Sequence, residues 1–193
     1  MIALLCGRLV SKTPDSAIVD VGGVGYEVFI PLSTYYGLPK ENGRVSFHTI
    51  TIIRDDTIEL YGFLTPEEKR LFRLLISVTG VGPRLAKNIL SGVSIEKLIE
   101  SIRGEDVTAL KRLPGVGKKT AQRVIVELKD KLKEGAERKE ERVEQGLKED
   151  VVSALRNLGY RLREAEEAVE EAANSAGKDF KSLLKEALKR LSE

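Results

Sequence analysis

The chain has 193 residues, enough for one large domain or two to three small ones, and its 41% of hydrophobic and 32% of charged residues are typical of a folded protein. Its single cysteine, Cys6, excludes an intrachain disulfide and fits a reducing compartment, so we expect a cytoplasmic protein. No apolar run reaches the roughly 18 residues of a membrane span, and the apolar start lacks the basic leader of a signal peptide.

The charges are spread unevenly along the chain, although the net charge is only +2. Residues 64–134 carry 15 Lys and Arg against 9 Asp and Glu, whereas residues 1–63 carry 5 against 7 and residues 135–193 carry 12 against 14. A local surplus of positive charge attracts a polyanion. The middle segment is therefore where we expect nucleic acid to bind.

Residues 1–63 have the pattern of a β-domain. Turn residues such as Gly22-Gly23 and Asn42-Gly43 separate apolar runs that are rich in Val, Ile, Tyr and Phe. These runs lie at 2–10, 16–21, 24–30, 45–53 and 58–63. Five short strands in about 60 residues predict a small closed barrel, for which the OB-fold is the common five-stranded case.

The pattern becomes helical at Thr65. Thr65-Pro66-Glu67-Glu68 combines an N-cap threonine, a proline at the first helical position and a glutamate three residues after the cap. Glycines punctuate the segment that follows. We expect an all-α domain over residues 64–134, with helices near 66–78, 83–91, 95–102, 105–112 and 118–133.

The rest of the chain divides into a charged segment and a helical one. Residues 135–147 are almost wholly charged or small, which predicts a flexible linker; the alternative is a charged continuation of the preceding helix. Residues 148–193 recover helical periodicity and predict a small three-helix bundle of the ubiquitin-associated kind. The expected fold class is therefore α+β and multidomain.

The helical domain contains an internal repeat of 35 residues. Residues 75–86 match residues 110–121, and each half predicts a helix, a tight Gly-Val-Gly turn and a second helix. Glycine lets the backbone turn sharply and come close to another group. Because each turn leads into a helix N-terminus, free N–H groups and the helix dipole favour an anion there.

Basic side chains follow both turns. A phosphate held by main-chain N–H groups and Lys or Arg carries no base identity, so binding should be independent of sequence and sensitive to salt. One Gly-x-Gly is weak evidence, because most are ordinary helix–helix turns, but two in register are much stronger. The predicted DNA-contact residues are Gly80, Val81, Gly82, Arg84, Lys87, Gly115, Val116, Gly117, Lys118, Lys119 and Arg123.

A nucleotide-binding loop is the competing interpretation of the second turn. Gly117-Lys118-Lys119-Thr120 is similar to the end of a Walker A motif, but Arg112 stands where its first glycine should be and Lys119 where Ser or Thr should be. We therefore expect no ATP binding and no catalytic residue. With one cysteine and one histidine, the chain predicts no metal site and no cofactor.

The whole chain resembles the RuvA family, the Holliday-junction-binding subunits of the bacterial RuvAB branch-migration complex. The stretches that carry the resemblance are Val21–Val28, Leu60–Phe63, Gly80–Ala86 and Leu113–Ala121. The order of barrel, double helix–hairpin–helix, charged linker and small helical domain also matches. The resemblance implies a non-catalytic subunit that recognises four-way junctions by structure, holds them open and square, and acts in recombination, DNA repair and the SOS response.

The resemblance also implies partners. It suggests a homotetramer, or an octamer, with the barrel as its tetramerisation domain, together with the hexameric ATPase RuvB and the junction resolvase RuvC. An acidic pin maps to Asp55 and Asp56, which by themselves also read as a hairpin turn. For RuvB, Leu155, Leu158 and Tyr160 are the candidate contacts; for each leucine the alternative is bundle core.

Two other functions remain as alternatives. A nuclease or glycosylase would need a carboxylate set or a lysine nucleophile, and Glu96, Glu105, Asp106 and Glu127 form no recognisable set. A general single-strand binder would need stacking aromatics on a basic barrel, whereas the barrel segment is net acidic.

Overall fold

The computed structural model describes residues 1–54, 57–173, 177 and 179–191, and for residues 134–143 the backbone alone. It divides into two compact units, Met1–Leu132 and Lys133–Glu193, which are described separately below. Among the described residues, no helix is long and apolar enough to cross a membrane.

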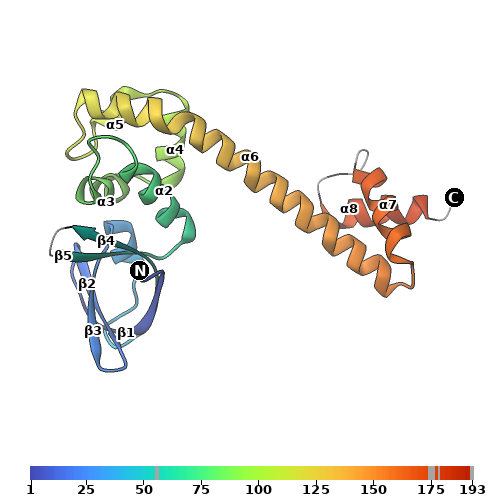
Figure 1. Ribbon diagram of the computed structural model, residues 1–193, viewed down its shortest axis with the longest axis horizontal. Helices are drawn as coiled ribbons and strands as arrows, with labels where there is room; N and C mark the ends of the chain where they lie inside the picture. The colour runs from blue at the N-terminus through green and yellow to red at the C-terminus, as the bar shows by residue number, and fades with distance from the viewer. Residues whose placement is uncertain (55–56, 174–176, 178, 192–193) are drawn as a thin grey trace. The chain divides into compact units, whose positions relative to one another are not determined.

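The first unit begins with a closed five-stranded barrel, which confirms the OB-type fold expected from the alternating sequence (Figure 1). Its strands are β1 (Leu4–Lys12), β2 (Ser16–Val21), β3 (Val24–Phe29), β4 (Arg44–Arg54) and β5 (Thr57–Phe63), in the order β1-β2-β3-β5-β4. All neighbours are antiparallel except β3 and β5. A short helix, α1 (Leu32–Gly37), lies between β3 and β4, where the sequence analysis expected no element.

The five helices that follow the barrel begin at the residues predicted from the sequence, except that the fourth begins at Val107 instead of residue 105. They are α2 (Pro66–Ile76), α3 (Pro83–Gly92), α4 (Ile95–Arg103), α5 (Val107–Lys111) and α6 (Lys118–Asn157). The capping box at α2 is complete, since Thr65 accepts from the Glu68 N–H and the Glu68 carboxylate accepts from the Thr65 N–H.

The barrel has a hydrophobic core of its own, and a second core joins the end of the barrel to the helices of this unit. Tyr61 and Phe63 of β5 pack on Phe72 of α2 with ring centroids 5.0 Å apart, and Phe29 lies 5.6 Å from Tyr61. Tyr61, Phe63 and Phe72 are almost completely buried. This aromatic contact places the end of β5 beside the helix that leads into the first Gly-Val-Gly turn.

The structure differs from the flexible linker expected at residues 135–147, because it places their backbone within α6. The segment is rich in Glu and Arg, which are good helix formers, and it contains no proline to end a helix. The small number of apolar side chains therefore does not decide between coil and helix, and the structure has the helical alternative.

The second unit is a small helical bundle, as expected. The last turns of α6 pack against α7 (Leu162–Ala173) and α8 (Phe180–Arg190) around a core that includes Val151, Leu155 and Leu183. Gly159 ends α6 with φ +100°, and the Tyr160 N–H donates to the Leu155 carbonyl at 3.2 Å. This is a Schellman-type cap, which requires the positive φ that glycine tolerates.

Candidate nucleic-acid interface

The two Gly-Val-Gly turns repeat each other bond for bond. In the first turn, the Val81 N–H donates to the Val78 carbonyl at 3.0 Å and the Ala86 N–H to the Gly82 carbonyl at 2.9 Å. In the second, Val116 donates to Leu113 at 3.1 Å and Ala121 to Gly117 at 2.9 Å. The donors and acceptors are all displaced by 35 residues, so the sequence repeat is also a structural repeat.

Each turn is fixed by a left-handed glycine and a buried valine. Gly80 has φ +88° and Gly115 has φ +80°, a backbone conformation that L side chains rarely adopt. The central valines, Val81 and Val116, are 4% and 7% exposed and belong to the shared core. Apolar anchoring of the centre leaves the flanking glycines at the edge of the fold.

The turns differ in the donors that their helices offer. Helix α3 begins with Pro83, which has no N–H, whereas α6 begins with Lys118, which has one. Neither helix has an acidic residue in its first turn, so the helix dipole at each N-terminus is not opposed locally. The second turn therefore offers an anion one more main-chain N–H donor than the first.

The second turn also carries exposed basic side chains. Lys118 and Lys119 are exposed, and the structure has no ion pair for either within the residues it describes. Arg123 is exposed too, but its Nη1 donates to the Thr79 carbonyl at 3.3 Å. The Arg123 side chain thus extends from α6, which follows the second turn, to the first turn and brings its positive charge beside Gly80.

At the first turn, a carboxylate of the protein already lies beside a basic side chain. Arg84 is 86% exposed, and its Nη2 lies 3.6 Å from Glu59 Oε1 on β5. Arg54, at the end of β4, also lies near this turn, since a Cβ on Gly82 would be 3.8 Å from Arg54 Nη2. Sequence reasoning missed Glu59, because nothing in a strand's alternation signals a neighbour 25 positions away.

Lys87 does not belong to this surface, contrary to the sequence prediction. It is 6% exposed, its Nζ is paired with the Asp15 carboxylate, and it lies 5.9 Å from the centroid of the Phe29 ring. These residues line a hollow of about 370 Å³ where α3 meets the barrel, together with Tyr61, Arg84 and Asn88. Lys87 therefore joins α3 to the barrel, and its charge is already neutralised.

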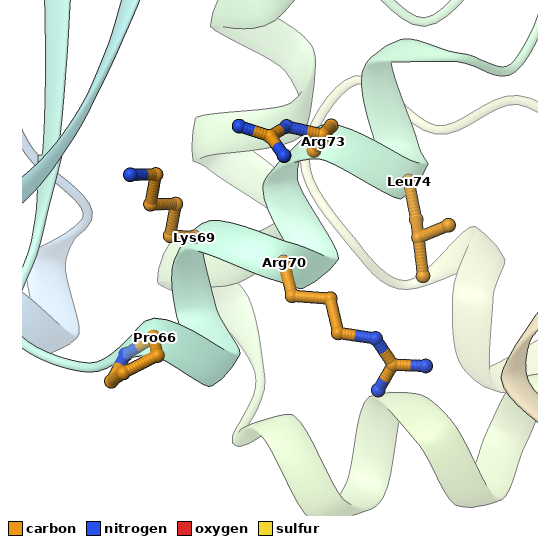
Figure 2. Close-up of a pocket in the computed structure, with 5 residues that line it drawn as sticks. All are labelled: Pro66, Lys69, Arg70, Arg73 and Leu74. Atoms are coloured by element: carbon orange, nitrogen blue, oxygen red, sulfur yellow. The ribbon is translucent and has the colours of Figure 1, made fainter. Parts of the chain in front are cut away.

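A further basic group on α2 was not singled out from the sequence. Lys69, Arg70 and Arg73 line a hollow with Pro66 and Leu74, and Figure 2 shows Lys69 and Arg70 pointing in different directions. Lys69 donates to the Ala3 carbonyl at 3.0 Å, and Arg70 lies 3.7 Å from Glu67. Because these charges do not converge on one point, the hollow does not resemble a phosphate site.

The other residues predicted from the sequence to have a function, the acidic pin and the RuvB contacts, lie outside the described residues or in the second unit. Asp55 and Asp56, the expected acidic pin, lie outside the described residues. Leu155 is fully buried in the core of the second unit, so the bundle-core alternative holds for it, whereas Leu158 is 62% exposed. Tyr160 is half-buried against the same core. Among the described residues, no group of three or more His, Cys, Asp or Glu could hold a metal ion.

Comparisons with known proteins agree along the whole chain. Family models match in order: the RuvA N terminal domain over residues 1–62, a SAM-like helix-hairpin-helix tandem over 72–130 and the RuvA C-terminal domain over 146–192. A protein of Acidobacterium capsulatum is 49% identical over 98% of both chains, and one of Geotalea daltonii 46% identical over 99% of both. Both are called Holliday junction branch migration complex subunit RuvA. With its barrel, its paired hairpins and its C-terminal bundle all matched, the chain belongs to the RuvA family.

Proposed function

We propose that this protein is the non-catalytic DNA-binding subunit of a branch-migration complex and that it grips four-way junctions through its two hairpins. The observation that carries the proposal is the structural repeat itself: two equivalent turns, each leading into a helix N-terminus with basic side chains. Paired clamps of this kind fit the two backbones of a duplex arm, and main-chain donors contact phosphate without reading bases.

The preference for a junction over plain duplex rests on more than one copy of the chain. In a homotetramer, four pairs of hairpins would each hold one arm and keep the junction open and square. Asp55 and Asp56 of the four copies would then repel phosphates at the centre and direct the strands into separate arms. An octamer would enclose the junction from both sides by the same contacts.

The second unit is proposed to recruit the motor, the hexameric ATPase RuvB, and the complex would also admit the resolvase RuvC. Leu158 supports this role, because it is a large apolar side chain that directly follows the end of α6 and is 62% exposed. Tyr160 lies two residues on and adds an aromatic edge. The chain itself would supply no ATP hydrolysis.

Binding to matched substrates tests the DNA proposal. Four-way junctions, duplexes and single strands of the same sequences should bind in that order of affinity, and permuting the junction sequence should change nothing. Size measurement in solution, with and without junction, should give a tetramer or octamer. Equal affinity for single strands and junctions would overturn the proposal, and strand cleavage or base release would overturn the non-catalytic part.

Substitution of the exposed leucine tests the partner proposal. Leu158→Glu should leave junction binding intact and abolish branch migration when RuvB and ATP are added. Glu166→Gln, an exposed position on α7, serves as the surface control. Full migration by Leu158→Glu would show that this residue is not in the RuvB contact.

A further inference from the structure

Glu59 is placed between the barrel and the first hairpin, where it contacts a side chain from each. Its Oε1 lies 3.6 Å from Nη2 of Arg84 at the start of α3, and its Oε2 accepts a hydrogen bond of 2.9 Å from the Tyr61 hydroxyl. The contact with Arg84 joins β5 to the turn that the function above assigns to DNA, and the contact with Tyr61 holds the Glu59 carboxylate within β5. Before any DNA is bound, the Glu59 carboxylate therefore already lies beside the arginine that would contact a phosphate.

The two partners of this ion pair are held unequally. The Glu59 side chain is 23% exposed and is fixed by Tyr61, whereas the Arg84 side chain is 86% exposed. Burial, followed by the hydrogen bond to Glu59, raises the pKa of Tyr61, so its hydroxyl remains a donor even in alkaline solution. The glutamate is thus the anchored partner, and the arginine can turn toward another anion at low cost, since such exposed pairs are weak.

The second hairpin has no such device among the described residues. The position equivalent to Arg84, 35 residues further on, is Lys119, which is exposed and for which the structure shows no carboxylate partner. The repeat therefore has one basic position that an internal carboxylate already holds and one that stands open to solvent.

We propose that Glu59 is an internal competitor for Arg84, which a backbone phosphate must displace, and that it weakens the first hairpin's hold on DNA. This inference rests on the proposed function. When a phosphate takes Arg84, Glu59 keeps its bond to Tyr61 and acquires a cation from solution. That uptake offsets one of the cations that the DNA releases, so Glu59 also flattens the salt dependence of binding.

The test is the substitution Glu59→Gln, which removes the charge but keeps an oxygen that can accept from Tyr61. Junction affinity should rise about three- to tenfold, because a competing pair and a repulsive charge near phosphate are both lost. The slope of log affinity against log salt should steepen by up to about 0.9 for each Arg84 that is released. Glu41→Gln is the matched control, since Glu41 is exposed and precedes β4, at the strand end opposite Arg54.

A double-mutant cycle separates competition for Arg84 from a general charge effect. In an Arg84→Ala background, Glu59→Gln should lose most of its benefit, whereas a general effect would persist in full and overturn the inference. Reduced affinity in Glu59→Gln alone would overturn it in the other direction, because Glu59 would then be holding Arg84 in its binding position.

Two further measurements keep the test decisive. Thermal melting checks that the variants fold; if Glu59→Gln melts early, Glu59→Asp withdraws the charge by one methylene and should give a smaller increase in affinity. Wild-type protein that fails to bind junctions would refute the proposed function. Wild-type protein that binds, with Glu59→Gln and Glu59→Asp indistinguishable from it, would refute this inference alone.

Discussion

The two hairpins of this protein have the same backbone but different surroundings. Their hydrogen bonds, left-handed glycines and buried valines correspond at a spacing of 35 residues. The first, however, lies against the barrel, where Glu59 pairs with Arg84 and Lys87 is buried against Asp15. The second presents Lys118 and Lys119 to solvent. Duplicated geometry therefore does not imply duplicated strength, because the neighbours decide which charges are free.

The largest effect should come from the open hairpin. Lys118→Ala with Lys119→Ala should reduce junction affinity on the order of 10- to 100-fold, since two charge-assisted contacts per subunit are lost. The slope of log affinity against log salt should flatten as well. Arg84→Ala, measured alongside, should cost less, because the wild-type arginine is shared with Glu59. A larger loss for Arg84→Ala would reverse the ranking of the hairpins.

The glycines should distinguish the hairpins by stability. Gly80→Ala and Gly115→Ala each place a Cβ on a residue with positive φ, which costs roughly 1–2 kcal/mol of unfolding free energy. Gly115→Ala should cost more, because its Cβ would meet Leu85 Cδ1 at 3.0 Å, whereas at Gly80 the nearest atom is Arg123 Nη1 at 3.7 Å. Urea unfolding measures both, and equal costs would mean that Leu85 yields freely.

Lys87 should behave as a structural residue of the first hairpin's helix. Lys87→Met keeps the apolar stem near Phe29 and removes the pair with Asp15, whose side chain is 69% exposed and stays solvated, so unfolding free energy should fall by under about 1 kcal/mol. Junction affinity and its salt slope should stay within about twofold of wild type, as expected for a charge that is not available to phosphate. A flattened slope would instead return Lys87 to the DNA contact.

The smallest effect concerns acid stability near the second hairpin. Glu105 is bonded to Lys129 of α6, and this hydrogen bond, with the charge of Lys129, lowers the pKa of Glu105 below its ordinary value of 4.5. A carboxyl whose folded pKa is depressed stabilises the fold above its unfolded pKa, and the contribution is lost as pH falls through the folded pKa. Glu105→Gln should therefore melt slightly earlier at pH 7 and show less further loss below pH 4.5. An unchanged melting profile would mean that the exposed pair contributes nothing.

The sequence by itself determined the features that depend only on residues close together in the chain. Turn glycines, helix caps and strand alternation act over a few positions, so the five strands, the starts of α2, α3, α4 and α6 and the 35-residue repeat could be predicted. Residues 135–147 mark the limit of that reasoning, because a charged segment with few apolar residues fits both a coil and the helix that the structure has.

Tertiary structure alone decided which of the predicted basic side chains are available to contact phosphate. Lys87 follows a hairpin in sequence, yet the packing of α3 on the barrel buries it against Asp15. Glu59 lies 25 positions before Arg84, and only closure of the barrel and its shared core with α2 brings the two together. Such long-range pairings depend on how domains pack, and a single sequence carries no local pattern for them.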